Sequence, residues 1–172
     1  MPRSSWKGTL LLKIKSKSFF RIKYDILQDK KIGQLKIPFT QLLPSLRLGA
    51  ISFNVGQEHF NIIVPLRGNK QIGFVASGYR LVKDDIDLAS AEFPARGSLD
   101  QFQVHWNEKI ITFSVNDGSN HIYIDGSLFG SIYYNFENKK VDAIDVDEKL
   151  PLEIQIFAYF AYKKYSELTL GI

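Results

Sequence analysis

The chain has 172 residues, of which 45% are hydrophobic and 23% are charged, as is ordinary for a globular protein. It contains no cysteine, which excludes a disulfide framework, a thiolate nucleophile and a cysteine-based metal site. The first residues lack the apolar core of a signal peptide, so we expect a cytoplasmic protein that forms one domain over residues 1–172.

The net charge of +4 is unevenly distributed along the chain. Residues 1–47 contain 11 Lys and Arg against two acidic residues, a net charge of +9. Residues 48–172 contain 11 Lys and Arg against 16 Asp and Glu, a net charge of −5. Such asymmetry can mark a surface for an anionic partner, and it is equally typical of a solvated strand face that improves solubility.

Between residues 10 and 24, apolar and basic side chains alternate with a period of two, which is typical of a half-buried strand. Leu12 and Ile14 fall on the apolar side of this strand. The other side forms a basic face, which we expect to point outward as the candidate anion-binding site, and which consists of Lys13, Lys15, Lys17, Arg21 and Lys23.

The middle of the chain consists of short apolar runs between turn-forming residues. We expect strands over residues 51–55, 60–64 and 71–76, with turns over residues 56–59 and 66–70. Short strands that are separated by turns roughly every 8–12 residues are typical of an all-β barrel or sandwich. The sequence therefore predicts a mainly β, antiparallel fold.

One hairpin pattern occurs three times, over residues 24–38, 79–94 and, more loosely, 122–133. Each copy is a strand, a polar turn and a second strand. The second strand opens with a large apolar residue and a small one, which are Ile32-Gly33, Leu88-Ala89 and Phe129-Gly130. Asp125-Gly126, the turn of the third copy, and a further turn at Asn107-Glu108 are short enough for tight hairpins. The repetition constrains the architecture and carries no chemistry of its own.

The end of the chain predicts one helix over about residues 150–168. Pro151 suits the first turn of a helix, and Lys163 and Lys164 complement the negative end of its dipole. Residues 154–162 are apolar or aromatic on every side, which is typical of a buried helix, and are fewer than the roughly 20 of a membrane span. We expect no transmembrane span and a helix inside a closed sheet, with a core of Ile154, Ile156, Phe157 and Phe160.

The layout resembles the tubby-like superfamily, which includes the tubby carboxy-terminal domain, the phospholipid scramblases and the plant LURP-one-related proteins. The hairpins over residues 24–38 and 79–94, the return strand over residues 129–132 and the segment over residues 142–162 carry the resemblance. It implies a closed antiparallel β-barrel of about twelve strands, with an apolar carboxy-terminal helix through or against it. It also implies binding of phosphoinositide headgroups by basic side chains, for which the basic face is the matching feature.

The resemblance to the scramblases also implies a candidate Ca²⁺ segment before the helix, at Asp142, Asp145 and Asp147. The spacing of these residues is not the ligand pattern of an EF-hand, and no glycine occupies the sharp turn. The alternative is that the acidic run caps the helix and compensates its dipole. We therefore treat the segment as a weak metal candidate and expect neither a metal nor a cofactor.

Residue patterns typical of enzymes are missing from the sequence. His59, His105 and His121 form no HExxH motif or close pair, and there is no GxGxxG, phosphate-loop or GxSxG motif. The aromatic residues have the regular spacing of a core, without the stacking strip of an RNA-binding sheet. We therefore expect neither an enzyme nor a nucleic-acid-binding protein.

Three functions remain open at this point. The first is a non-enzymatic binding or regulatory module that contacts anionic phospholipid or phosphoinositide headgroups at the membrane periphery. The second is a cytosolic protein that binds a protein partner, for example to neutralise a toxin. The third is a lipocalin-like carrier of a small ligand, which requires an open barrel lumen, so the position of the helix discriminates this function from the others.

Overall fold

The computed structural model describes residues 12–17, 23–37, 51–69, 73–94, 101–116, 119–134, 141–146 and 149–170. These ranges contain fourteen strands and one helix. The elements are β1 (Leu12–Ser16), β2 (Lys23–Leu27), β3 (Lys31–Lys36), β4 (Ile51–Val55), β5 (Glu58–Ile63), β6 (Leu66–Asn69), β7 (Gly73–Ala76), β8 (Gly78–Lys83), β9 (Ile86–Glu92), β10 (Gln103–Trp106), β11 (Lys109–Asn116), β12 (Ser119–Ile124), β13 (Ser127–Tyr133), β14 (Val141–Val146) and α1 (Leu152–Leu170).

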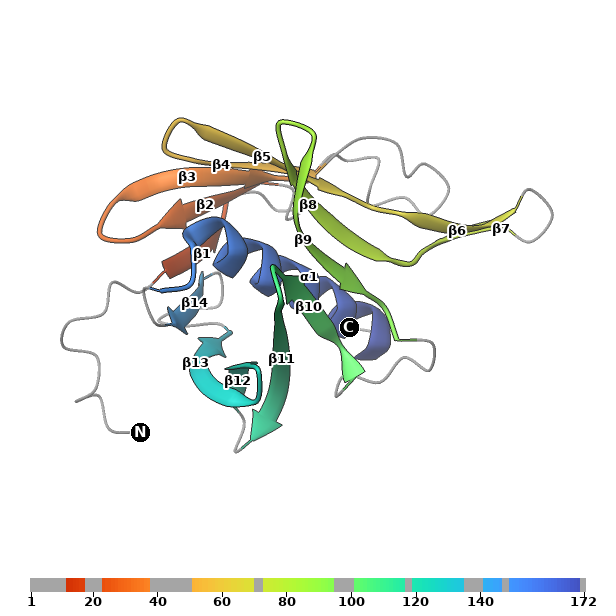
Figure 1. Ribbon diagram of the computed structural model, residues 1–172. Coiled ribbons are helices and arrows are strands. Elements are labelled where there is room, and N and C mark those ends of the chain that lie inside the picture. Colours follow the sequence, from red (N-terminus) through yellow and green to blue (C-terminus); the bar gives the residue numbers. More distant parts are fainter. Residues whose placement is uncertain are drawn as a thin grey trace.

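Twelve of the strands close into an antiparallel barrel in the order β1-β14-β13-β12-β11-β10-β9-β8-β5-β4-β3-β2. The remaining two strands, β6 and β7, pair with each other and extend away from the barrel as a separate ribbon (Figure 1). The prediction of a mainly β, closed antiparallel barrel of about twelve strands with a carboxy-terminal helix is therefore confirmed.

The repeated hairpin pattern corresponds to three hairpins that share one irregularity. The register shifts between Ile26 and Leu27 in β2–β3, and the two other hairpins shift at the equivalent place. The residue before each shift pairs with the small residue of the pattern, in the pairs Ile26–Gly33, Leu81–Ala89 and Ile122–Gly130. Because a β-bulge bends a strand and increases its twist, the repetition supplies curvature at three points of the barrel wall.

Two of the small residues also permit a close approach of the neighbouring strand. A Cβ atom added at Gly33 would lie 1.8 Å from the carbonyl oxygen of Asn54, and one added at Gly130 would lie 2.2 Å from that of Asp145. No side chain fits at such distances, so glycine is required at both positions.

The predicted tight turns are present. Asn107 has a positive φ of 53° between β10 and β11, and Asp125 and Gly126 have φ values of 49° and 82° between β12 and β13. Positive φ values at the centre of a two-residue turn match the right-handed twist of the flanking strands. Residues of the Asn and Asp type tolerate this conformation, which explains why they occupy these turns.

Three segments differ from the prediction. Residues 66–69, which we predicted to be a turn, form β6, and the turn before β5 ends at Gln57 rather than at residue 59. The acidic run, which we predicted to cap the helix, contributes β14 instead. Residues 141–144 are buried on both faces of this strand, which removes the alternation by which a half-buried strand is recognised.

The helix begins and ends two residues later than predicted. Pro151 precedes α1, and its carbonyl accepts hydrogen bonds of 3.0 Å from the backbone N–H groups of Ile154 and Gln155. Lys163 and Lys164 lie more than one turn before the last helical residue, so they do not serve the helix dipole as we predicted.

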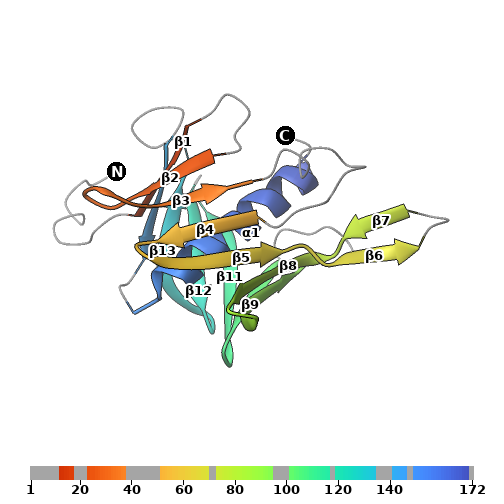
Figure 2. The ribbon, with the colours of Figure 1, turned by 90° about the horizontal axis from the view of Figure 1, so that it is seen from above.

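Helix α1 lies inside the barrel (Figures 1 and 2). Its rings contact strands on different sides: Phe160 packs edge-on against Tyr79 of β8 at 5.4 Å, and Tyr162 stacks on Phe113 of β11 at 4.3 Å. The predicted helix core is at most 3% exposed and consists of Ile154, Ile156, Phe157 and Phe160. Among the described residues, no helix is long and apolar enough to cross a membrane.

Candidate anion-binding face

The alternation of β1 separates an apolar inner face from a basic outer face. Leu12 and Ile14 are each 1% exposed and belong to the core. Lys15, which points to the opposite side, is exposed, and Lys13 on the same side is partly buried. Of the other predicted members of the basic face, Lys17 and Lys23 are exposed and Arg21 lies outside the described residues.

Lys36 also lies on the basic face, although it was not among the predicted members of this face. Lys23 of β2 is paired directly opposite Lys36 of β3, and both are exposed. Lys17 is next to them, because its backbone N–H donates a hydrogen bond of 2.9 Å to the carbonyl of Lys23. Lysines from three consecutive segments of the barrel wall therefore lie side by side. Counting outward from the turn of the β2–β3 hairpin without the shift between Ile26 and Leu27 would have paired Lys23 with Leu35, so no signal in the sequence indicated this pair.

A carboxylate lies within the basic face. Asp25 of β2 is 6% exposed although it lies on the outer face of its strand. Its oxygens are 3.0 Å from Nζ of Lys17 and 2.8 Å from Nζ of Lys31, and Nε2 of Gln34 donates to it at 3.4 Å. Burial alone would raise the pKa of Asp25, but the hydrogen bonds from Lys31 and Lys17 outweigh it and hold the pKa below its ordinary value.

A second carboxylate faces the opposite way, into the barrel. Asp142 alternates with Ile144 of the core, so it lies on the inner face of β14. Lys163 of α1 forms an ion pair of 2.6 Å with it, and the hydroxyl of Tyr159 donates a hydrogen bond to it. Burial and the charge of Asp142 raise the pKa of Tyr159, so this hydroxyl keeps its proton and serves as a donor.

The three aspartates of the weak metal candidate are not brought together in the described part of the chain. Asp142 lies on the inner face of β14 and Asp145 on the outer face, while Asp147 lies outside the described residues. No group of three or more His, Cys, Asp or Glu close enough to hold a metal ion occurs among the described residues. Burial raises the pKa of Asp145.

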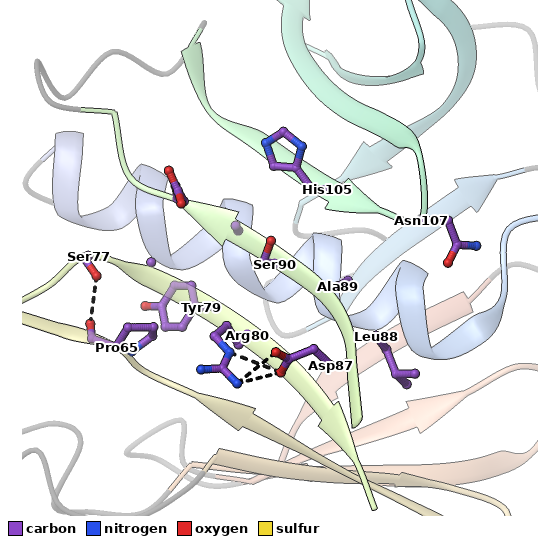
Figure 3. Close-up of a pocket in the computed structure, with 13 residues that line it drawn as sticks. Pro65, Ser77, Tyr79, Arg80, Asp87, Leu88, Ala89, Ser90, His105 and Asn107 are labelled. Atoms are coloured by element: carbon purple, nitrogen blue, oxygen red, sulfur yellow. Dashed lines mark hydrogen bonds and ion pairs between the residues drawn. The ribbon is translucent and has the colours of Figure 1, made fainter. Parts of the chain in front are cut away.

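A polar groove of about 580 Å³ lies over β8, β9 and β10 (Figure 3). Arg80 forms an ion pair with Asp87 in this groove. Its Nη2 donates hydrogen bonds to both carboxylate oxygens, at 2.7 and 3.0 Å. Ser90 and His105 face each other on adjacent strands at its other side. The groove thus combines the ion pair of Arg80 and Asp87 with further polar side chains, Glu92 among them, and it lies apart from the basic face in the order of the strands.

The three histidines lie on different strands. His59 is on β5, His105 is on β10 and His121 is on β12, where its Nδ1 is 3.0 Å from the hydroxyl oxygen of Ser131. The spacing of the histidines in the sequence predicted no close pair. In the structure, each of the three belongs to a separate part of the barrel wall.

The chain matches no known protein-family model, no curated protein and no solved structure. A closed barrel with an internal helix is the architecture that the resemblance to the tubby-like superfamily implies. The architecture is present, whereas membership of that superfamily stays a prediction.

Proposed function

We propose that the protein is a non-enzymatic binding module whose outer face over β1–β3 binds anionic phospholipid headgroups, phosphoinositides among them. One observation carries this proposal. The described residues between 12 and 37 contain seven lysines and two aspartates, Asp25 and Asp29. Each basic residue near an anionic membrane surface contributes about 1 kcal/mol of attraction. The lysines are Lys13, Lys15, Lys17, Lys23, Lys30, Lys31 and Lys36.

The scaffold suits such a role because the lysines are held on a closed sheet. A barrel has no free edges, and neighbouring strands lie about 4.8 Å apart, so side chains that share a face keep a fixed spacing. The inner faces of β1, β2 and β3 pack into the core through Ile14, Ile26 and Leu35, each at most 1% exposed. The basic face can therefore meet a flat anionic surface without rearrangement of the fold.

Sedimentation with vesicles tests the proposal. Phosphatidylcholine vesicles are compared with vesicles that also contain phosphatidylserine or a phosphoinositide, over a range of salt concentrations. We expect the anionic vesicles alone to bind the protein, and salt to weaken the binding because it screens exposed charges. Absence of binding at low salt would overturn the proposal.

Matched charge reversals localise the binding. Lys15→Glu and Lys23→Glu each change the net charge by the same amount as Lys109→Glu, which lies on β11. Each reversal on the basic face removes one attraction and adds one repulsion, so we expect a loss of about tenfold or more in affinity. An equal loss for Lys109→Glu would mean that net charge rather than this face determines the binding.

The protein-partner function keeps one supporting observation, which is the polar groove over β8–β10. If a partner binds there, Ser90→Arg should abolish its co-purification and leave vesicle binding unchanged. The carrier function loses the cavity that it requires, because α1 occupies the lumen.

A further inference from the structure

The facing lysines of β2 and β3 are an unusual arrangement for an exposed sheet. Residues directly opposite each other in an antiparallel pair have Cβ atoms about 4.5–5.5 Å apart, and like charges at such positions destabilise the sheet. Lys23 and Lys36 occupy such positions. Within the described residues, neither of them forms an ion pair with a carboxylate. The fold therefore keeps two repelling ammonium groups at one place on its surface.

The nearby carboxylate does not relieve this repulsion. Asp25 is paired opposite Gln34, two residues along β2 and β3 toward the turn of the hairpin. Its two oxygens are engaged by Lys17 and Lys31 from opposite sides. Asp25 thus pairs with Lys17, which lies beside Lys23, and with Lys31 near the hairpin turn, and not with Lys23 or Lys36. The facing pair is therefore the place where an external anion gains the most binding free energy.

We propose that Lys23 and Lys36 form a subsite for one phosphate monoester group, with Lys17 beside it. The proposal rests on the function proposed above and names the headgroup chemistry that the basic face selects. A phosphate monoester carries about −1.5 to −2 charges at neutral pH, so one such group neutralises both lysines. A phosphodiester or a carboxylate carries a single negative charge and leaves one ammonium group uncompensated.

The same chemistry occurs in two sources, a lipid headgroup and a soluble phosphate ester, and the test has an arm for each. In the soluble arm, binding of inositol 1,4,5-trisphosphate is measured by calorimetry at constant ionic strength, with glycerophosphoinositol as the phosphodiester control. In the membrane arm, vesicles with phosphatidylinositol 4,5-bisphosphate are compared with vesicles that contain phosphatidylinositol at equal total charge.

The variants are Lys23→Gln and Lys36→Gln, with Lys109→Gln as the matched control on β11. We expect each of the first two to weaken monoester binding at least tenfold and to weaken diester binding less than threefold. The control should change both by less than twofold. Equal losses for all three variants, or equal affinities of the wild-type protein for monoester and diester, would overturn the subsite.

The two arms separate the subsite from the membrane function. Monoester-selective binding in solution that depends on Lys23 and Lys36, without binding to any vesicle, supports the subsite and overturns the membrane function. Vesicle binding that is indifferent to both variants supports the membrane function and overturns the subsite. Failure to bind in either arm overturns both.

Discussion

Two carboxylates on opposite faces of the barrel wall have similar surroundings and different consequences. Ile14 of β1 is paired with Asp142 of β14, and the next residue, Lys15, is paired with Asp25 of β2. Both aspartates are 6% exposed, and lysine engages both. Asp142 lies inside the barrel and Asp25 lies on the outer surface, and the residues of β1 that are paired with them are consecutive.

The partners of the two carboxylates show what each does. Lys163 and Tyr159, which both engage Asp142, belong to α1, so this carboxylate fixes the helix against the wall. The partners of Asp25 belong to the basic face, and the two lysines among them are about half exposed. Removal of the inner carboxylate leaves Lys163, whose side chain is only 20% exposed, without its carboxylate. Removal of the outer one leaves lysines that are already about half exposed to water.

The largest effect is expected from Asp142→Ala. The loss of one partner of a fully buried ion pair costs about 3–5 kcal/mol, and because Lys163 is 20% exposed we expect a loss of about 3 kcal/mol, at the lower end of this range. Urea unfolding at neutral pH measures this change. Asp145→Ala, on the outer face of the same strand, should change the free energy of unfolding by about 0.5 kcal/mol or less. Similar values for the two variants would contradict the distinction between the inner and outer faces.

A smaller effect is expected from Tyr159→Phe. The variant removes a hydrogen bond to a charged group, which contributes about 1.5–3 kcal/mol, and keeps the buried ring in place. A double-mutant cycle with Asp142→Asn tests whether the two residues act together. If the free-energy changes are additive, Tyr159 stabilises the helix independently of Asp142, and the interpretation of the inner carboxylate as the fixing point of α1 fails.

The barrel and its helix could be predicted because their signals are local. The period of two in β1, the Asn and Asp residues in tight turns and the apolar surface of residues 154–162 all follow from neighbouring residues. The role of Asp142 could not be predicted, because it depends on the helix returning past β14 inside the barrel. The same holds for β6, whose turn-like composition gave no indication of the ribbon.

The candidate site could be predicted in part for a related reason. Alternation assigns a lysine to the outer face of a strand, and it did so for Lys15 and Lys23. It does not assign a partner on the next strand, because pairing depends on the turn length and on the bulge between Ile26 and Leu27. The opposition of Lys23 and Lys36 is a property of register, so the structure was needed to recognise it.

The outer carboxylate should contribute less stability than the inner one and show a defined pH dependence. Asp25→Asn should destabilise the protein by about 1 kcal/mol at neutral pH, because its ion pairs involve exposed lysines. The folded state lowers the pKa of Asp25, so its contribution is present above the unfolded pKa of about 3.9 and is lost as the pH falls through the folded value. The difference between wild type and variant should therefore shrink below about pH 4.

Asp145→Asn provides the control of opposite sign. Burial raises the pKa of Asp145, so the charged carboxylate disfavours the folded state at neutral pH. The variant should be more stable than the wild type by about 0.5 kcal/mol or less at pH 7, and the difference should vanish in acid, where the wild-type carboxyl is protonated. A difference for Asp25→Asn that grows as the pH falls would contradict the direction of its pKa shift.

The smallest effect is expected from Lys36→Gln, and its sign is the informative part. Removal of one of two like charges that face each other should stabilise the protein by about 0.2–0.5 kcal/mol at low salt. Lys15→Gln is the control. Lys15 lies directly opposite Asp25 in the register of β1 and β2, so its removal relieves no comparable repulsion between like charges.

Salt and phosphate distinguish this repulsion from a change in packing. The gain in Lys36→Gln should disappear at about 1 M salt, where the Debye length falls to about 3 Å. It should reverse when inositol 1,4,5-trisphosphate is added, because a ligand that binds the folded state stabilises the wild type more than the variant. A gain that persists in high salt would mean that Lys36 is unfavourable for reasons other than the charge of Lys23. The repulsion between Lys23 and Lys36 is the feature that distinguishes the lysines of the outer face from lysines that only improve solubility, and this result would remove it.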